Sequence, residues 1–216
     1  MRASMHLGRL HSAALYRVKR LQDRYNALHK LPKTEQSLGL AYIAIELDNA
    51  NICTLREFTI STLREAKTLS GNKISVNINI QREEEIGAYI LSILNYVKYK
   101  KLKHPTAVKR IDEPTIRDPK EIEKILASCS ASNLPSLQTA LSLNTNLFRD
   151  LKNIRHFYAH RSKDTFNKAS VKAAIMGITN PSHPDDILRH VLTGKTHSVL
   201  EEWLFDAELF YDLLMQ

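Results

Sequence analysis

The chain has 216 residues, of which 43% are hydrophobic and 25% are charged, and these ordinary globular values argue against general disorder. Its two cysteines, Cys53 and Cys129, fit neither a metal-binding spacing nor a disulfide framework, so we expect no metal, no cofactor and a reducing cytoplasm. Charged residues interrupt every apolar run well before the roughly 18 residues of a membrane span, which argues against a membrane protein.

The net charge of +8 is unevenly distributed along the chain. Residues 1–33 contain eight Lys and Arg side chains against one acidic residue, whereas 198–216 contain five acidic residues and no Lys or Arg. A second basic segment, 96–110, has no acidic residue, and its cations are Lys98, Lys100, Lys101, Lys103, Lys109 and Arg110. This asymmetry favours a polyanionic partner, with solvated helix faces as the alternative interpretation of each cluster.

The spacing of apolar residues predicts helices through most of the chain, beginning with 3–31 and 35–69. Residues 74–80 alternate apolar and polar side chains, which predicts a short strand or an extended arm. The remaining predicted helices are 83–101, 119–130, 134–142, one beginning around Asn144 as its N-cap, 168–178, one opened by Pro184, and 198–215. We expect a single domain over 1–216, with a basic loop at about 102–119 and a C-terminal helical extension at about 182–216.

The helix predicted from Asn144 carries Arg155 and His160 within an otherwise apolar stretch. Both side chains need polar partners when buried, so a helix that served packing alone would not contain them. A neutral imidazole can take the proton of a ribose 2′-hydroxyl, whose oxygen then attacks the adjacent phosphate. The guanidinium would neutralise charge that develops on the phosphate oxygens, so the pair suits RNA chemistry that requires no metal.

The segment Arg155-His156-Phe157-Tyr158-Ala159-His160 resembles the active-site motif of the HEPN superfamily of helical domains. That motif is Arg, then four to six residues of which the first is usually polar, then His. The resemblance implies an antiparallel helical bundle, to which this chain adds extra helices, and metal-independent endoribonuclease activity that leaves a 2′,3′-cyclic phosphate. It also implies that Arg155 holds the phosphate, His160 is the acid or base, His156 orients one of them, and two motif helices face each other in a homodimer.

The resemblance extends to supporting residues, partners and a biological role. Family members place a polar residue on an earlier helix near the motif, and Glu46 and Asn49 are the candidates here. RNA is the implied partner, with the six cations of 96–110 and the N-terminal helix guiding its backbone. The implied role is that of a toxin or antiviral defence effector, restrained by an antitoxin or another regulatory partner. The alternative is a non-catalytic module that dimerises, binds RNA or a nucleotide and docks on a partner protein.

Two other interpretations of the motif remain open. In the first interpretation, His160 serves only to interact with the negative end of the helix dipole, while Arg155 forms a salt bridge to Asp150 or to another helix. In the second interpretation, His156 and His160 have the spacing of a zinc-binding helix. Phe157 occupies the glutamate position of that pattern, however, and no third ligand is evident in the sequence.

Overall fold

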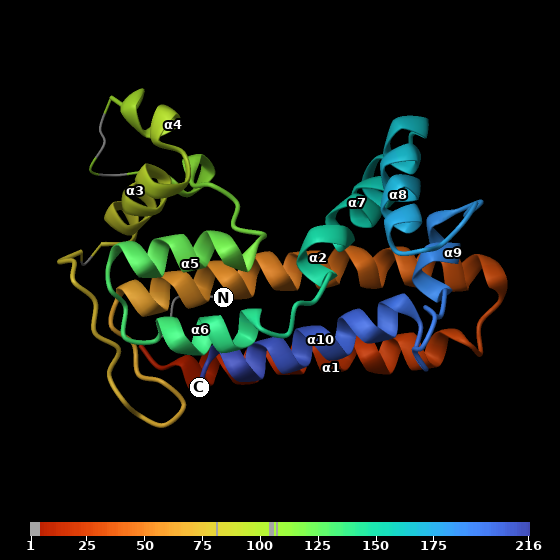
Figure 1. Ribbon diagram of the computed structural model, residues 1–216, viewed down its shortest axis with the longest axis horizontal. Helices are drawn as coiled ribbons and strands as arrows, with labels where there is room; N and C mark the ends of the chain where they lie inside the picture. The colour runs from red at the N-terminus through yellow and green to blue at the C-terminus, as the bar shows by residue number, and fades with distance from the viewer. Residues whose placement is uncertain (1–4, 81, 104–105, 107) are drawn as a thin grey trace. The chain divides into compact units, whose positions relative to one another are not determined.

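The computed structural model describes residues 5–80, 82–103, 106 and 108–216 (Figure 1). These residues form helices, and the β-bridges among them are isolated, so the predicted all-α class is confirmed. None of the described helices is long and apolar enough to cross a bilayer. The chain divides into two compact units, and three helices contribute residues to both: α1 (Leu7–Leu28), α2 (Lys33–Leu63) and α10 (Val199–Leu214).

The first unit consists of Met1–Ala13, Ile52–Leu143 and Phe210–Gln216. Besides the ends of the shared helices it contains α3 (Glu83–Leu94), α4 (Tyr96–Lys100), the 3₁₀ turn η1 (Arg110–Asp112), α5 (Pro119–Ser128) and α6 (Leu134–Leu141). Helix α5 packs against both α3 and α6, and the short α4 packs back onto α3 (Figure 1). Apolar side chains of these helices are fully buried, among them Ile86, Ile122 and Leu137.

A buried cation links three parts of the first unit. The Arg56 side chain, which is 13% exposed, donates hydrogen bonds to Glu57, Glu83 and Glu113 over 2.8–3.1 Å. These three carboxylates come from α2, from the first turn of α3 and from the segment that follows η1. Because Arg56 joins residues far apart in the sequence, it fixes the position of α3 on the end of α2.

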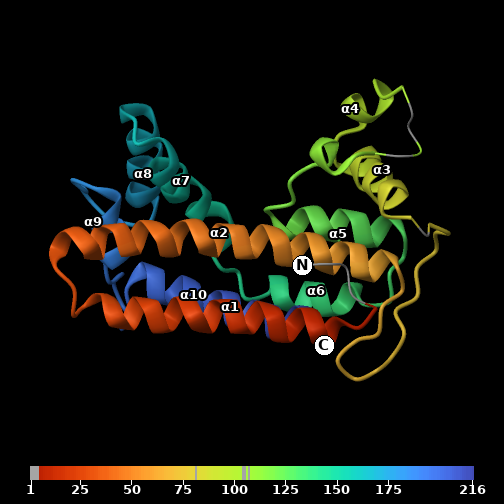
Figure 2. The same cartoon turned by 180° about the vertical axis from the view of Figure 1, so that it is seen from behind.

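The second unit consists of Ala14–Asn51 and Asn144–Leu209. It contains α7 (Leu147–His160), α8 (Lys163–Ile175) and α9 (Pro184–Arg189) together with its parts of the shared helices. Helices α7 and α8 lie side by side as a helical hairpin (Figures 1 and 2). Arg161 ends α7 in the left-handed conformation, with a φ of 44°, and Ser162 caps α8 by accepting a hydrogen bond from the Thr165 N–H.

Two predicted helix boundaries are wrong because asparagine adopts a different role from the one expected. The predicted helix 83–101 breaks at Asn95, whose side chain accepts a hydrogen bond from the Lys98 N–H and begins α4. Asn144 is not the N-cap of α7 but a turn residue with a φ of 48°. Thr145 accepts the hydrogen bond from the backbone N–H of Leu147 instead, at 3.1 Å.

The second and eighth helices also differ from the prediction. Helix α2 ends at Leu63 and not at residue 69, because Glu65 adopts a left-handed conformation with a φ of 55°. Helix α8 begins at Lys163, five residues before the predicted start at 168, because the Ser162 cap precedes it. The remaining helices agree with the prediction to within a few residues, which is the usual uncertainty of a helix end.

Residues 74–80 form an extended arm and not a strand. The arm is held by the segment after α5: the Asn77 N–H donates to the Cys129 carbonyl at 2.7 Å, and the Ser132 N–H donates to the Ser75 carbonyl at 3.0 Å. Its apolar residues are buried or half-buried and its polar residues are exposed, as the alternating sequence predicts. The predicted basic loop at 102–119 contains only η1 within its described residues, and residues 104, 105 and 107 lie outside them.

Candidate active site

Helix α7 carries the whole Arg155–His160 motif in the second unit. Leu147, Leu151 and Ile154 are buried at helical spacing and fix which side of α7 packs inward. Arg155 and His156 therefore lie at the border of the buried face and are half-buried, while His160 is exposed in the last turn.

Arg155 forms an ion pair with Asp48 of α2. The distance between Arg155 Nε and Asp48 Oδ2 is 3.4 Å, and the side chains are 27% and 6% exposed. The expected alternative of a salt bridge to another helix is thus correct, and the alternative bridge to Asp150 is not. Because the carboxylate is buried and the guanidinium is still partly exposed, Asp48 positions Arg155 and leaves part of its surface open to a ligand.

His156 and His160 lie against each other one turn apart. Their ring centroids are 4.5 Å apart and the rings meet edge to face. Loss of hydration lowers the pKa of His156, and the positive charges of His160, Lys168 and Arg155 lower it further. A proton on His160 therefore disfavours a proton on His156.

Asp150 supports the motif helix from its buried side. Its carboxylate is fully buried and accepts two hydrogen bonds from Arg149, at 2.9 and 3.0 Å. Lys172 of α8 approaches the same carboxylate at 3.7 Å. This acid therefore joins α7 to α8 and has no contact that would make it a partner of Arg155.

The predicted supporting residues lie on α2 but bond to each other. Asn49 Nδ2 donates a hydrogen bond to Glu46 Oε1 at 3.2 Å, and both side chains are half-buried. The α2 residue that forms an ion pair with Arg155 is Asp48. Asp48 lies between Leu47 and Ala50, both of which are buried. Its carboxylate is therefore buried as well and needs a cation as a partner.

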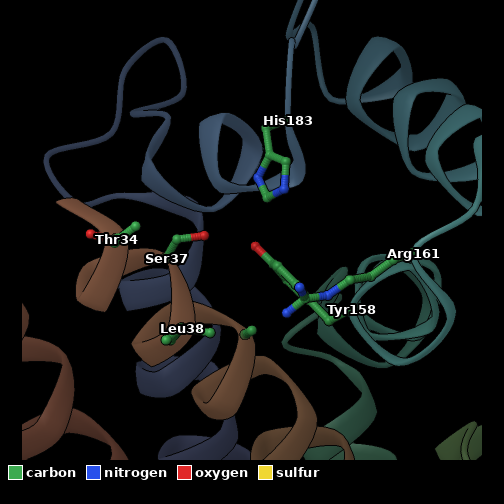
Figure 3. Close-up of a pocket in the computed structure, with 7 residues that line it drawn as sticks. Thr34, Ser37, Leu38, Tyr158, Arg161 and His183 are labelled. Carbon is green, nitrogen blue, oxygen red and sulfur yellow. The ribbon is translucent and has the colours of Figure 1, made fainter.

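A pocket of about 260 Å³ lies on a different side of α7 from His160 (Figure 3). Its lining combines hydroxyls, an imidazole, a guanidinium and two apolar side chains from α2, α7 and the N-cap of α9: Thr34, Ser37, Leu38, Ala41, Tyr158, Arg161 and His183. Tyr158 and His160 are two residues apart, so about 200° separates them around the helix axis. This pocket could not be predicted from the sequence, because its residues come from three separate segments.

The Tyr158 hydroxyl at this pocket is already engaged. It donates a hydrogen bond to Asp185 Oδ1 at 2.5 Å, and burial together with the negative charge of Asp185 raises the pKa of Tyr158. His183 stacks edge to face on Phe157, with ring centroids 5.2 Å apart, and accepts a hydrogen bond from the Asp185 N–H. These contacts join α7 to α9, so Tyr158 serves primarily to hold the motif helix.

The six predicted RNA-binding cations belong to the first unit, whereas the motif belongs to the second. Lys98 Nζ donates a hydrogen bond to the Asp112 carbonyl at 2.8 Å and lies 3.8 Å from the Asp112 carboxylate. All six are exposed, and they lie on α4, on η1 and in the segment between them: Lys98, Lys100, Lys101, Lys103, Lys109 and Arg110. They are therefore available to a polyanion.

Within the described part of the chain, no group of three or more His, Cys, Asp and Glu side chains is arranged to hold a metal ion. The zinc interpretation of His156 and His160 thus finds no third ligand among those residues. Comparisons with protein-family models, with curated proteins and with solved structures find no match to this chain.

Proposed function

We propose that this chain is a metal-independent endoribonuclease of HEPN type, acting in the cytoplasm as a toxin or antiviral defence effector. The observation that carries the proposal is the contact between the His156 and His160 rings. Arg155, which directly precedes His156 on the same helix, is held in place by the buried Asp48. This arrangement supplies the two functions that RNA cleavage requires, which are proton exchange near neutral pH and a fixed cation for the phosphate.

The proposed reaction uses the 2′-hydroxyl of the RNA as its nucleophile. The neutral His160 imidazole takes the hydroxyl proton, and the 2′-oxygen forms a bond to the adjacent phosphorus. The bond from phosphorus to the 5′-oxygen breaks, that oxygen takes up a proton, and a 2′,3′-cyclic phosphate remains. Arg155 neutralises the non-bridging oxygens while their negative charge increases.

His156 orients and tunes His160 in this proposal. Its lowered pKa keeps His156 largely neutral at neutral pH, so its ring can accept or donate a hydrogen bond without adding a second full charge. Arg155 and His160 are five residues apart, which separates them by about 140° around the helix. A second motif helix in a homodimer would complete a site that one helix leaves half open.

The test is cleavage of RNA in the presence of a chelator by the wild type, Arg155→Ala and His160→Ala. His190→Ala is the matched control, because His190 is an exposed histidine at the C-cap of α9. We expect the wild type and the control to cleave RNA to products with cyclic phosphate ends, and the two motif variants to lose cleavage by at least about 100-fold. Full cleavage by His160→Ala would sink the catalytic assignment.

The non-catalytic module is the second candidate, and the Arg155–Asp48 ion pair is the observation that favours it. An arginine that serves only to neutralise a buried acid needs no substrate. In that case the wild type binds RNA or a partner protein and leaves RNA intact, and Arg155→Ala lowers the stability of the fold without changing any activity.

A further inference from the structure

Helix α4 exposes an aromatic side chain at the start of the basic segment 96–110. Tyr96, the first residue of α4, is 55% exposed, and the following Val97 is exposed as well. A large apolar ring on a short surface helix is not needed for packing, because the buried contacts of this region are made by other side chains. The exposed Tyr96 ring is therefore accessible to a ligand with a flat apolar face.

The orientation of the Tyr96 ring is fixed by its contact with the Tyr99 ring. Tyr99 packs against a small core formed by Ala88, Leu91 and Val108. The Tyr96 ring stacks on Tyr99, with centroids 6.2 Å apart and an angle of 23° between the planes. Tyr96 is thus a platform with a rigid support, and little conformational entropy is lost when a second flat group stacks on it.

The charges around Tyr96 are almost all positive. Lys100 Nζ lies 4.7 Å from the centre of the Tyr96 ring. Residues 96–103 contain four lysines and no acidic residue, and Asp112 is the carboxylate that approaches them, 3.8 Å from Lys98 Nζ. A ligand that presents a flat apolar face and several negative charges together fits this surface, and a single-stranded nucleic acid has that composition.

We propose that Tyr96 stacks on an unpaired base of RNA while Lys100 and Lys101 contact the adjoining phosphates. The surface thereby selects single-stranded RNA, because the bases of a duplex are stacked on each other and closed to an aromatic side chain. This inference rests on the proposed function in one respect, which is that RNA is the partner. It concerns binding and does not require that the chain cleaves what it binds.

Docking of a protein is the other occupant to test, since Val97 and Ile111 are exposed nearby. The four lysines of 96–103 argue against it, because a protein-binding surface is usually depleted of lysine and not enriched in it. RNA is therefore the occupant that the charges favour.

The experiment measures binding of a short single-stranded RNA with 2′-O-methyl groups, which blocks the 2′-hydroxyl attack and separates binding from cleavage. Tyr96→Ala is expected to weaken binding by about 10-fold, the effect of losing one stacked base, whereas Tyr96→Phe keeps the flat ring and binds as the wild type does. The matched control is Tyr42→Ala, because Tyr42 is an exposed tyrosine of α2 with Arg24 4.1 Å from the centre of its ring, and it lies outside both basic segments.

Two further measurements separate stacking from charge. Tyr96→Ala should leave the salt dependence of binding unchanged, whereas Lys101→Ala should reduce its slope by about 0.7 log units. Binding of the matched RNA duplex should respond to Lys101→Ala and not to Tyr96→Ala. Thermal unfolding of each variant shows whether its fold is intact.

Wild-type affinity in Tyr96→Ala, or an equal loss in Tyr42→Ala, would overturn the proposal. Binding of a protein that Tyr96→Ala abolishes while RNA affinity stays unchanged would overturn it as well. The outcome is separable from the fate of the ribonuclease proposal. Tyr96-dependent binding with no cleavage of unmodified RNA would support the platform and refute the nuclease. Cleavage with no effect of Tyr96 on binding would do the reverse.

Discussion

Replacing Asp48 with Asn removes the charge that faces Arg155 and keeps the size of the side chain. At the observed 3.4 Å and an effective dielectric constant near 20, the attraction between the two charges is about 5 kcal/mol. Burial of Asp48 offsets much of this attraction, because its carboxylate loses water on folding. We therefore expect Asp48→Asn to lower the free energy of unfolding by about 1–2 kcal/mol, which corresponds to a fall in Tm of roughly 2–8 °C for a chain of this length.

The assay is a double-mutant cycle by chemical or thermal unfolding with Asp48→Asn, Arg155→Gln and the double variant. Arg155→Gln alone leaves Asp48 buried without its cation, so it should cost more than Asp48→Asn, and the double variant should recover part of that loss. Asp23→Asn is the control, because Asp23 pairs with Lys19 at a similar 3.3 Å but both side chains are well exposed. We expect the control to change stability by less than about 0.5 kcal/mol.

Additive effects of the two substitutions, within about 0.5 kcal/mol, would refute the assignment of Asp48 as the residue that holds Arg155. If the two are coupled, Asp48→Asn should also reduce RNA cleavage, even though Asp48 is buried and touches no substrate. We expect this loss of cleavage to result from a more mobile Arg155 side chain and not from unfolding. It should therefore persist at temperatures at which the variant is fully folded.

The remaining predictions concern three other contacts. Tyr158→Phe should lower stability by about 1–2 kcal/mol in denaturant unfolding, since it removes the hydrogen bond to Asp185. Because the pKa of Tyr158 is raised above 10.0 in the folded chain, the unfolded chain releases this proton first and stability falls as pH rises above about 10; that part of the fall should be absent in Tyr158→Phe. In NMR titrations His156 should have a pKa below 6.5, and His160→Ala should raise it by removing a neighbouring positive charge. Arg56→Met should lower the free energy of unfolding by about 3 kcal/mol, because it leaves Glu57 buried without its cation, and a loss below about 1 kcal/mol would contradict this role.

The helices could be predicted from the sequence wherever a long apolar stripe faces a core. The stripe of Leu147, Leu151 and Ile154 gave α7 and the buried side of its motif. The ends of helices were predicted less well, because they depend on which of several polar side chains makes one hydrogen bond. Asn144 was the expected N-cap of α7, but it adopts a left-handed backbone conformation and Asn146 is the N-cap, without a capping hydrogen bond from its side chain.

The contacts within the motif could be predicted and the contacts between helices could not. His156 and His160 lie together because they are one turn apart on the same helix, which is a local property. Whether Glu46, Asp48 or Asn49 meets Arg155 depends on the rotation of α2 against α7, and successive residues of a helix point about 100° apart. A supporting role of Glu46 and Asn49 therefore stays a prediction, whereas the ion pair with Arg155 is formed by Asp48.

The Arg155–Asp48 pair limits what one chain can do with a phosphate. A phosphate that approaches Arg155 also approaches the Asp48 carboxylate, so the net attraction is weaker than that of a lone guanidinium. Strong binding of the transition state then needs a second cation, and a second copy of the motif helix would supply one. If so, mixing the inactive Arg155→Ala and His160→Ala chains should restore part of the cleavage, because each hybrid site receives Arg155 from one chain and His160 from the other. The contrary outcome is that the chains form hybrid dimers but the mixture is as inactive as its components. In that case each chain acts through its own Arg155 and His160, and Asp48 has to release Arg155 during the reaction.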